Sequence, residues 1–129
     1  MRAEGRLKRM NVEQSVRIYF DAWNETDAGK RMQLLSGIWS DRTLYIDPTV
    51  KTEGAQALSD NIDKVLAKFP GSKIFLTSNI EEHHGQIRFN WKRVLPDGIM
   101  GRDGVDYCEI GDDGKFTRVI GFFGELTLR

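Results

Sequence analysis

With 129 residues, 40% of them hydrophobic and 29% charged, the chain is long enough for one domain with a sizeable core and too short for two ordinary ones. Its 19 basic and 19 acidic residues leave no net charge, which argues against nucleic acid or a membrane surface as a partner. One cysteine cannot form an intrachain disulfide, and no apolar run reaches the roughly 20 residues that span a bilayer. We therefore expect a cytoplasmic protein of one domain.

The beginning of the chain divides into an arm and a helix. Residues 1–10 are basic without a following apolar stretch, unlike a secretory signal, and we expect a flexible arm there and a folded domain over residues 11–129. Asn11 and Gln14 stand where a capping box would start a helix, which we place at residues 12–25. The apolar residues of its buried face are Val12, Val16, Tyr19, Phe20 and Trp23.

Two further helices flank a short predicted strand. Thr26 or Asp27 can cap a second helix, which ends near residues 37–40. Alternation then predicts a strand over residues 43–47, which the following proline stops. A third helix repeats the spacing of the first and ends at Pro70; its apolar residues are Leu58, Ile62, Val65, Leu66 and Phe69.

After Gly71 the apolar residues alternate with polar ones, which predicts strands. Turn sequences separate the runs and favour hairpins over crossover connections. The runs lie at residues 74–76, 87–91, 105–107 and 116–122. Helices ahead of a meander indicate an α+β fold, in which three N-terminal helices pack on an antiparallel sheet.

The last strand is apolar on both faces, because Val119 and Phe123 alternate with Ile120 and Phe122. Its outer face therefore needs cover. A homodimer through the sheet is the economical solution, and a C-terminal segment or a second partner are the alternatives.

Three polar residues in apolar surroundings are the candidate catalytic residues: Tyr19, Asp47 and Asp106. A phenol and carboxyls in an apolar pocket can transfer protons, because burial favours the neutral acid and a neutral acid can donate to a developing oxyanion. Each residue also has a structural alternative. Asp47 could cap the turn that Pro48 starts, and Tyr19 could be a packed core ring. Alternation alone does not decide which face of the sheet Asp106 occupies.

Three local stretches carry a resemblance to a known family: residues 40–48, which end in Asp-Pro; Val105-Asp106, ahead of Gly114-Lys115; and Tyr19, eight residues before Asp27. With the order of helices and strands, they resemble the nuclear transport factor 2-like fold, a cone-shaped α+β barrel that includes SnoaL-like polyketide cyclases and ketosteroid isomerase. The resemblance spans residues 12–128 and implies three N-terminal helices on a strongly curved, mainly antiparallel sheet.

The resemblance to ketosteroid isomerase also implies roles for the three candidates. Asp47 would be the catalytic base, and Tyr19 with a protonated Asp106 would hold the oxyanion. Two features differ from the isomerases. Ile62 stands where they have a supporting tyrosine, and residues 121–124 resemble SnoaL-like proteins of unassigned activity.

These features predict a cavity for a small apolar or cyclic organic ligand, without a metal or organic cofactor. Its predicted lining is Phe20, Trp23, Leu35, Phe69, Phe89 and Trp91. Three functions stay open: a cofactor-independent isomerase, cyclase or lyase that transfers protons next to a carbonyl; a non-catalytic ligand-binding or association module; and a hydratase or epoxide hydrolase-like enzyme that activates water. An arginine between two aspartates would mark the last.

Overall fold

The computed structural model describes residues 11–129, and the predicted arm over residues 1–10 lies outside them. The elements in chain order are α2 (Val12–Asn24), α3 (Ala28–Ser36), β1 (Trp39–Asp47), β2 (Val50–Glu53), α4 (Ala55–Lys68), β3 (Lys73–Leu76), β4 (Glu81–His83), β5 (Gln86–Val94), β6 (Met100–Ile110) and β7 (Phe116–Phe123). The predicted α+β class and the three helices ahead of the meander are confirmed. No helix in the described part of the chain is both long and apolar enough to cross a bilayer.

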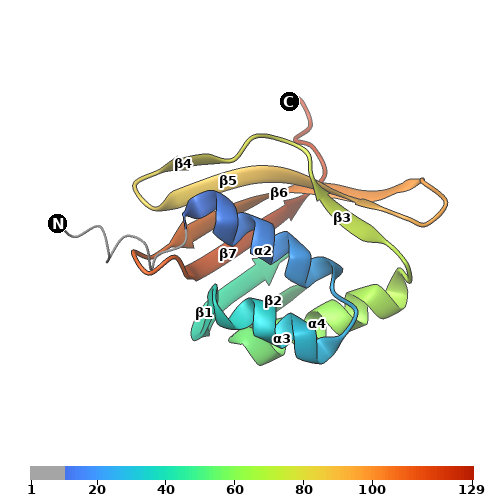
Figure 1. Ribbon diagram of the computed structural model, residues 1–129. Coiled ribbons are helices and arrows are strands. Elements are labelled where there is room, and N and C mark those ends of the chain that lie inside the picture. The colour runs from blue at the N-terminus through green and yellow to red at the C-terminus, as the bar shows by residue number, and fades with distance from the viewer. Residues whose placement is uncertain (1–10) are drawn as a thin grey trace.

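The strands form one seven-stranded sheet in the order β2-β1-β7-β6-β5-β3, and β4 pairs with β5. The pairing of β1 with β7 is parallel, and the other pairings between these strands are antiparallel. Figure 1 shows the sheet curving around α2, with α3 and α4 beside β1 and β2. The helices and the curved sheet together make the cone that the sequence predicts.

The first helix starts as predicted. The Gln14 backbone N–H donates to Asn11 Oδ1 at 2.8 Å, and the Asn11 N–H donates to Gln14 Oε1 at 3.1 Å, which completes the capping box. Asp27, one of the two predicted caps, accepts from the Lys30 N–H at 2.9 Å and starts α3. Because these ends depend on neighbouring residues alone, their local sequence suffices to place them.

The first strand is longer than predicted and returns as a hairpin. β1 begins at Trp39 rather than at residue 43, and Asp47 pairs with Val50 across a two-residue connection. The sequence analysis missed β2 and β4, because both are short and neither shows alternating apolar residues. The parallel pairing of β1 with β7 places Ile46 opposite Ile120, and therefore Asp47 beside Gly121.

Candidate active site

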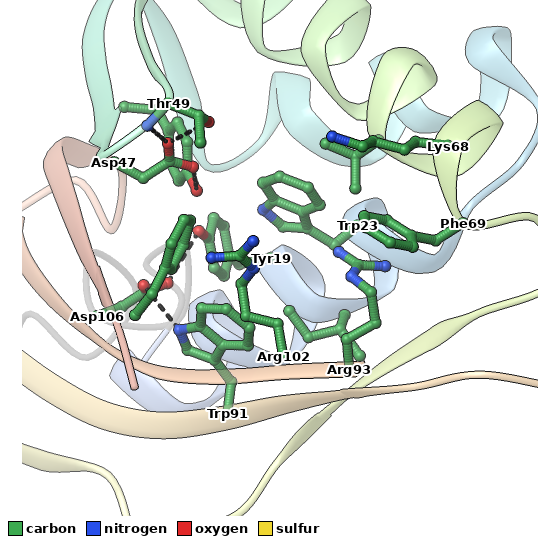
Figure 2. Close-up of a pocket in the computed structure, with 14 residues that line it drawn as sticks. Tyr19, Trp23, Asp47, Thr49, Lys68, Phe69, Trp91, Arg93, Arg102 and Asp106 are labelled. Atoms are coloured by element: carbon green, nitrogen blue, oxygen red, sulfur yellow. Dashed lines mark hydrogen bonds between the residues drawn. The ribbon is translucent and has the colours of Figure 1, made fainter. Parts of the chain in front are cut away.

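A cavity of about 160 Å³ lies between α2, α4 and the sheet, and Tyr19, Asp47 and Asp106 all line it. Trp23, from α2, and Trp91, from β5, supply large parts of its apolar wall. Figure 2 shows the two carboxyl groups on the same side of the pocket, Asp47 above and Asp106 below. The fold therefore brings the three candidate catalytic residues to one cavity.

Asp106 is a buried carboxyl held by two donors. Its side chain is 4% exposed, the Tyr19 hydroxyl donates to Oδ2 at 3.0 Å, and the Trp91 indole N–H donates to Oδ1 at 3.0 Å. Burial raises the pKa of Asp106 to about 7; the bonds from Tyr19 and Trp91 oppose that rise, and the charge of Asp47 adds to it. Near neutral pH the neutral acid and the carboxylate are therefore both populated.

The protonation of Asp106 controls what Tyr19 can donate to. When Asp106 is ionised, the Tyr19 hydroxyl donates to it. When Asp106 is neutral, its own O–H can donate to the Tyr19 oxygen, which frees the Tyr19 proton for an acceptor in the cavity. Burial raises the pKa of Tyr19 well above its usual value, with the Asp106 charge acting in the same direction, so the phenol keeps its proton as a donor.

Asp47 both caps the turn that Pro48 starts and lines the cavity. Its Oδ1 caps the turn by accepting from the Thr49 N–H at 2.7 Å, the Thr49 hydroxyl at 2.7 Å and the Val50 N–H at 3.1 Å. Its Oδ2 accepts from the Tyr45 hydroxyl at 2.6 Å and lines the same cavity. An ionised carboxylate can accept all four bonds, and one lone pair on Oδ2 remains available.

Gly121, on β7, is the position where the two carboxyls meet. It pairs with Asp106 across the sheet and lies beside Asp47. A Cβ at this position would lie 2.9 Å from Asp106 Oδ1 and 3.5 Å from Asp47 Cβ. The absent side chain leaves room for both acids beside the cavity.

Gly104, on β6, makes a similar space for Trp91. The two residues pair across the sheet, and a Cβ at position 104 would overlap the Phe122 carbonyl oxygen and lie 2.7 Å from the Trp91 ring. Gly104→Ala is therefore expected to destabilise the protein by about 1–3 kcal/mol, because neither backbone nor ring can move freely. Urea unfolding measures the change. Gly101→Ala on the same strand is the control, since its Cβ would meet nothing closer than 3.6 Å; equal losses in both variants would contradict the prediction.

Trp23 contributes a buried N–H to the cavity. The residue is 4% exposed, and its Nε1 has no acceptor in hydrogen-bond geometry among the described residues, although it lies near enough to the Tyr19 hydroxyl to lower the pKa of that phenol slightly against the effect of burial. In Figure 2 the indole nitrogen points to the side of the pocket where Asp47 and Asp106 lie. A buried donor without a partner is costly, so a ligand acceptor at this place would be bound favourably.

The comparisons with known proteins place the chain in a family. No family model matches the sequence, and no curated protein matches it. A protein from Agrobacterium tumefaciens, named as a candidate isomerase of the SnoaL-like family, is 31% identical, with a TM-score of 0.83 over 88% of this chain and 97% of that one. This chain belongs to the SnoaL-like family.

More distant structural neighbours share the fold. A nuclear transport factor 2-like protein of unknown function from Exiguobacterium is 19% identical, with a TM-score of 0.67 over 87% of this chain and 99% of that one. A protein of unknown function with a cystatin-like fold from Methylobium petroleophilum is 15% identical, with a TM-score of 0.72 over 91% and 78% of the two chains.

In this SnoaL-like protein, three of the six residues predicted to line the cavity lie there, and the other three do not. Trp23, Phe69 and Trp91 line the cavity. Phe20, Leu35 and Phe89 do not line it and lie in the hydrophobic core instead. For Phe20 and Phe89 the physical reason is their packing against Tyr19, which itself lines the cavity and meets their rings edge-on at centroid distances of 5.9 and 6.3 Å.

Five polar lining residues are not among those that the sequence predicts: Tyr45, Thr49, Lys68, Arg93 and Arg102. Tyr45 is 5% exposed and donates to Asp47. Arg93 continues the inward alternation of Phe89 and Trp91 along β5, so the same period that predicted the strand could have placed it. Lys68 ends the third helix and is exposed, and nothing in its local sequence marks a site.

The described residues offer no ready metal site. Within residues 11–129 no three His, Cys, Asp or Glu side chains gather where they could share an ion.

Proposed function

We propose that this protein binds a small cyclic carbonyl compound in the cavity and transfers a proton at the carbon next to the carbonyl, as an isomerase or cyclase. One observation carries the proposal: two carboxyls line one apolar cavity in different environments. Asp106 is buried with a pKa of about 7, whereas Asp47 accepts four hydrogen bonds suited to an ionised carboxylate. Paired acids with unlike environments are the arrangement from which an acid and a base can be assigned.

The proposed step uses Asp47 as the base. Its Oδ2 takes the proton from the carbon, the C–H electron pair moves into a carbon–carbon double bond, and the carbonyl oxygen becomes an enolate oxygen. Tyr19 donates to that oxygen while neutral Asp106 donates to Tyr19, and the Trp23 N–H is a further donor. Return of the proton from Asp47 to a different carbon completes an isomerisation.

Membership of the SnoaL-like family supports a ligand-binding or isomerase-type protein. Ile62, where the isomerases have a supporting tyrosine, is fully buried in the core and donates nothing. Trp91 donates to Asp106 Oδ1, which holds the carboxyl in place and leaves Oδ2 facing the Tyr19 hydroxyl. The water-activating alternative is less well supported, because neither Asp47 nor Asp106 forms an ion pair with an arginine among the described residues.

Deuterium exchange tests the proposal without a known product. The protein is incubated in D₂O with a panel of one- to three-ring cyclic ketones, and NMR measures deuterium incorporation next to the carbonyl. We expect protein-dependent incorporation into at least one ketone that binds. Binding without incorporation across the panel would contradict proton transfer and favour the non-catalytic ligand-binding module.

We further propose a homodimer through the outer face of the sheet. Phe122 is 58% exposed on β7, beside half-buried Val105 and Ile120. Such a patch costs free energy in water unless it is covered.

Sedimentation at micromolar concentration should give twice the chain mass, and Phe122→Lys should give a monomer. Ile99→Lys, at the exposed tip of the β5–β6 hairpin, should stay dimeric; a monomeric wild-type protein would contradict the proposal.

A further inference from the structure

Three cationic side chains line the cavity together with the two acids: Lys68, Arg93 and Arg102. Figure 2 shows Arg93 and Lys68 on the side of the pocket opposite Asp47 and Asp106, with Trp23 between the two sides. The mechanism proposed above uses none of these cations.

Arg93 is the most unusual of the three, because its charge is buried. The residue is 5% exposed, and within residues 11–129 its one side-chain hydrogen bond runs from Nη1 to Ser72 Oγ at 2.9 Å. No carboxylate in the described part of the chain lies within ion-pair distance of it. Its guanidinium carbon lies 5.9 Å from the centre of the Trp23 ring, which compensates the charge only in part. A guanidinium has five N–H donors, so most of them lack a protein acceptor.

Arg31 shows how the same fold holds a buried arginine that serves structure. Arg31 is fully buried and binds the Glu25 carbonyl through Nε and Nη2. Its Nη1 binds the Ser59 carbonyl and hydroxyl and pairs with Asp63 at 2.8 Å. Every nitrogen of Arg31 has an acceptor and its charge has a partner. Arg93 has neither, and it differs from Arg31 in facing a cavity.

The charge of the cavity lining is positive. Three cations face two acids, and Asp106 carries only part of a charge near neutral pH because its pKa is about 7. Burial lowers the pKa of Arg93, as expected for a cation removed from water; Tyr45 opposes this shift, and the charge of Arg102 adds to it. Arg102 and Lys68 are exposed and lie against Phe123 and Phe69, at 4.2 and 5.9 Å from the ring centres.

We propose that the ligand carries a carboxylate, which Arg93 binds at the end of the cavity away from Asp47 and Asp106, with Arg102 and Lys68 adding charge at the entrance. The planar guanidinium fork matches the two oxygens of a carboxylate, and the buried site strengthens the pair. The orientation of the substrate rests on the proposed function: Arg93 holds the carboxylate at one end, and the reacting carbonyl lies between Tyr19 and Asp47. The substrate class is then a small cyclic keto acid.

Matched pairs of aryl carboxylates and carboxamides test the anion site directly. The probes are benzoate, 2-naphthoate and 2-anthroate with their primary amides, and quenching of tryptophan fluorescence at pH 7.5 measures binding. We expect at least one carboxylate to bind about 10- to 100-fold more tightly than its amide, as for a charge-assisted hydrogen-bonded pair.

Arg93→Gln should remove this preference for the carboxylate. Arg88→Gln should keep it, because Arg88 is an exposed arginine of the same strand that pairs with Glu81 outside the cavity. The absence of any preference for a carboxylate, including through absence of binding, overturns the proposal.

A second measurement needs no ligand. Arg93→Met should leave the melting temperature of the free protein unchanged or raise it, because it removes a buried charge that lacks a partner. Arg31→Met should lower it, because Asp63 and the Ser59 carbonyl lose their partner. A fall in Arg93→Met as large as that in Arg31→Met would show that Arg93 serves structure and would overturn the proposal. A carboxylate preference without deuterium exchange would instead reject proton transfer and leave the anion site in place.

Discussion

Asp47→Asn is expected to lower the rate of deuterium exchange by about 10²- to 10⁴-fold while ligand affinity and fold persist. The amide has nearly the same shape as the carboxylate, but it cannot accept a proton from carbon. Its oxygen can still accept from the Thr49 and Val50 N–H groups, so the turn after β1 is retained. Initial exchange rates by NMR, with probe affinity by fluorescence, measure the two effects separately.

The control for this variant is Asp41→Asn, an exposed acid on the same strand that does not line the cavity. It should keep the wild-type exchange rate. If Asp47 served only as a cap, Asp47→Asn would leave the exchange rate intact, and Asp47→Ala would cost about 0.5–2 kcal/mol of stability, as for other lost side-chain caps. That pattern would remove Asp47 from the catalytic assignment.

Asp106 is expected to make the protein less stable as pH rises from about 4 to about 7. The folded pKa of about 7 lies above the usual 3.8, so between these values the native state binds more protons than the unfolded state, and stability falls with pH. Below pH 3.8 the group is neutral in both states and contributes nothing; above pH 7 it is ionised in both and the loss is complete. The difference corresponds to about 4 kcal/mol.

Asp106→Asn should remove this pH dependence. Its amide can donate to the Tyr19 oxygen as the neutral acid can, and its oxygen can accept from Trp91. We therefore expect the variant to match the wild type near pH 4 and to exceed its stability at pH 8. Urea unfolding of both proteins over this pH range measures the difference, which cancels the titration of the other acids. Parallel stability curves would contradict the burial of an ionisable Asp106.

Several parts of this protein follow from local sequence, because short-range spacing and hydrogen bonds are their cause. Asn11 and Gln14 start α2 by bonding to each other, and the change of period after Gly71 separates helices from strands. A polar side chain within an apolar run was enough to select Tyr19 and Asp106. The alternation of β5 also indicates an inward position for Arg93, which lies just beyond the predicted run over residues 87–91.

The assembly of the site depends on pairings that the local sequence does not specify. Tyr19 and Asp106 are 87 residues apart, and Asp47 reaches them because β1 pairs with β7 in parallel at Gly121. Local sequence was sufficient for the three helices, for the longer strands and for the choice of Tyr19, Asp47 and Asp106 as candidates. The packing of distant segments then sets which of these side chains share the cavity, because the neighbours of a strand and the partners of a buried charge come from segments far apart in the sequence.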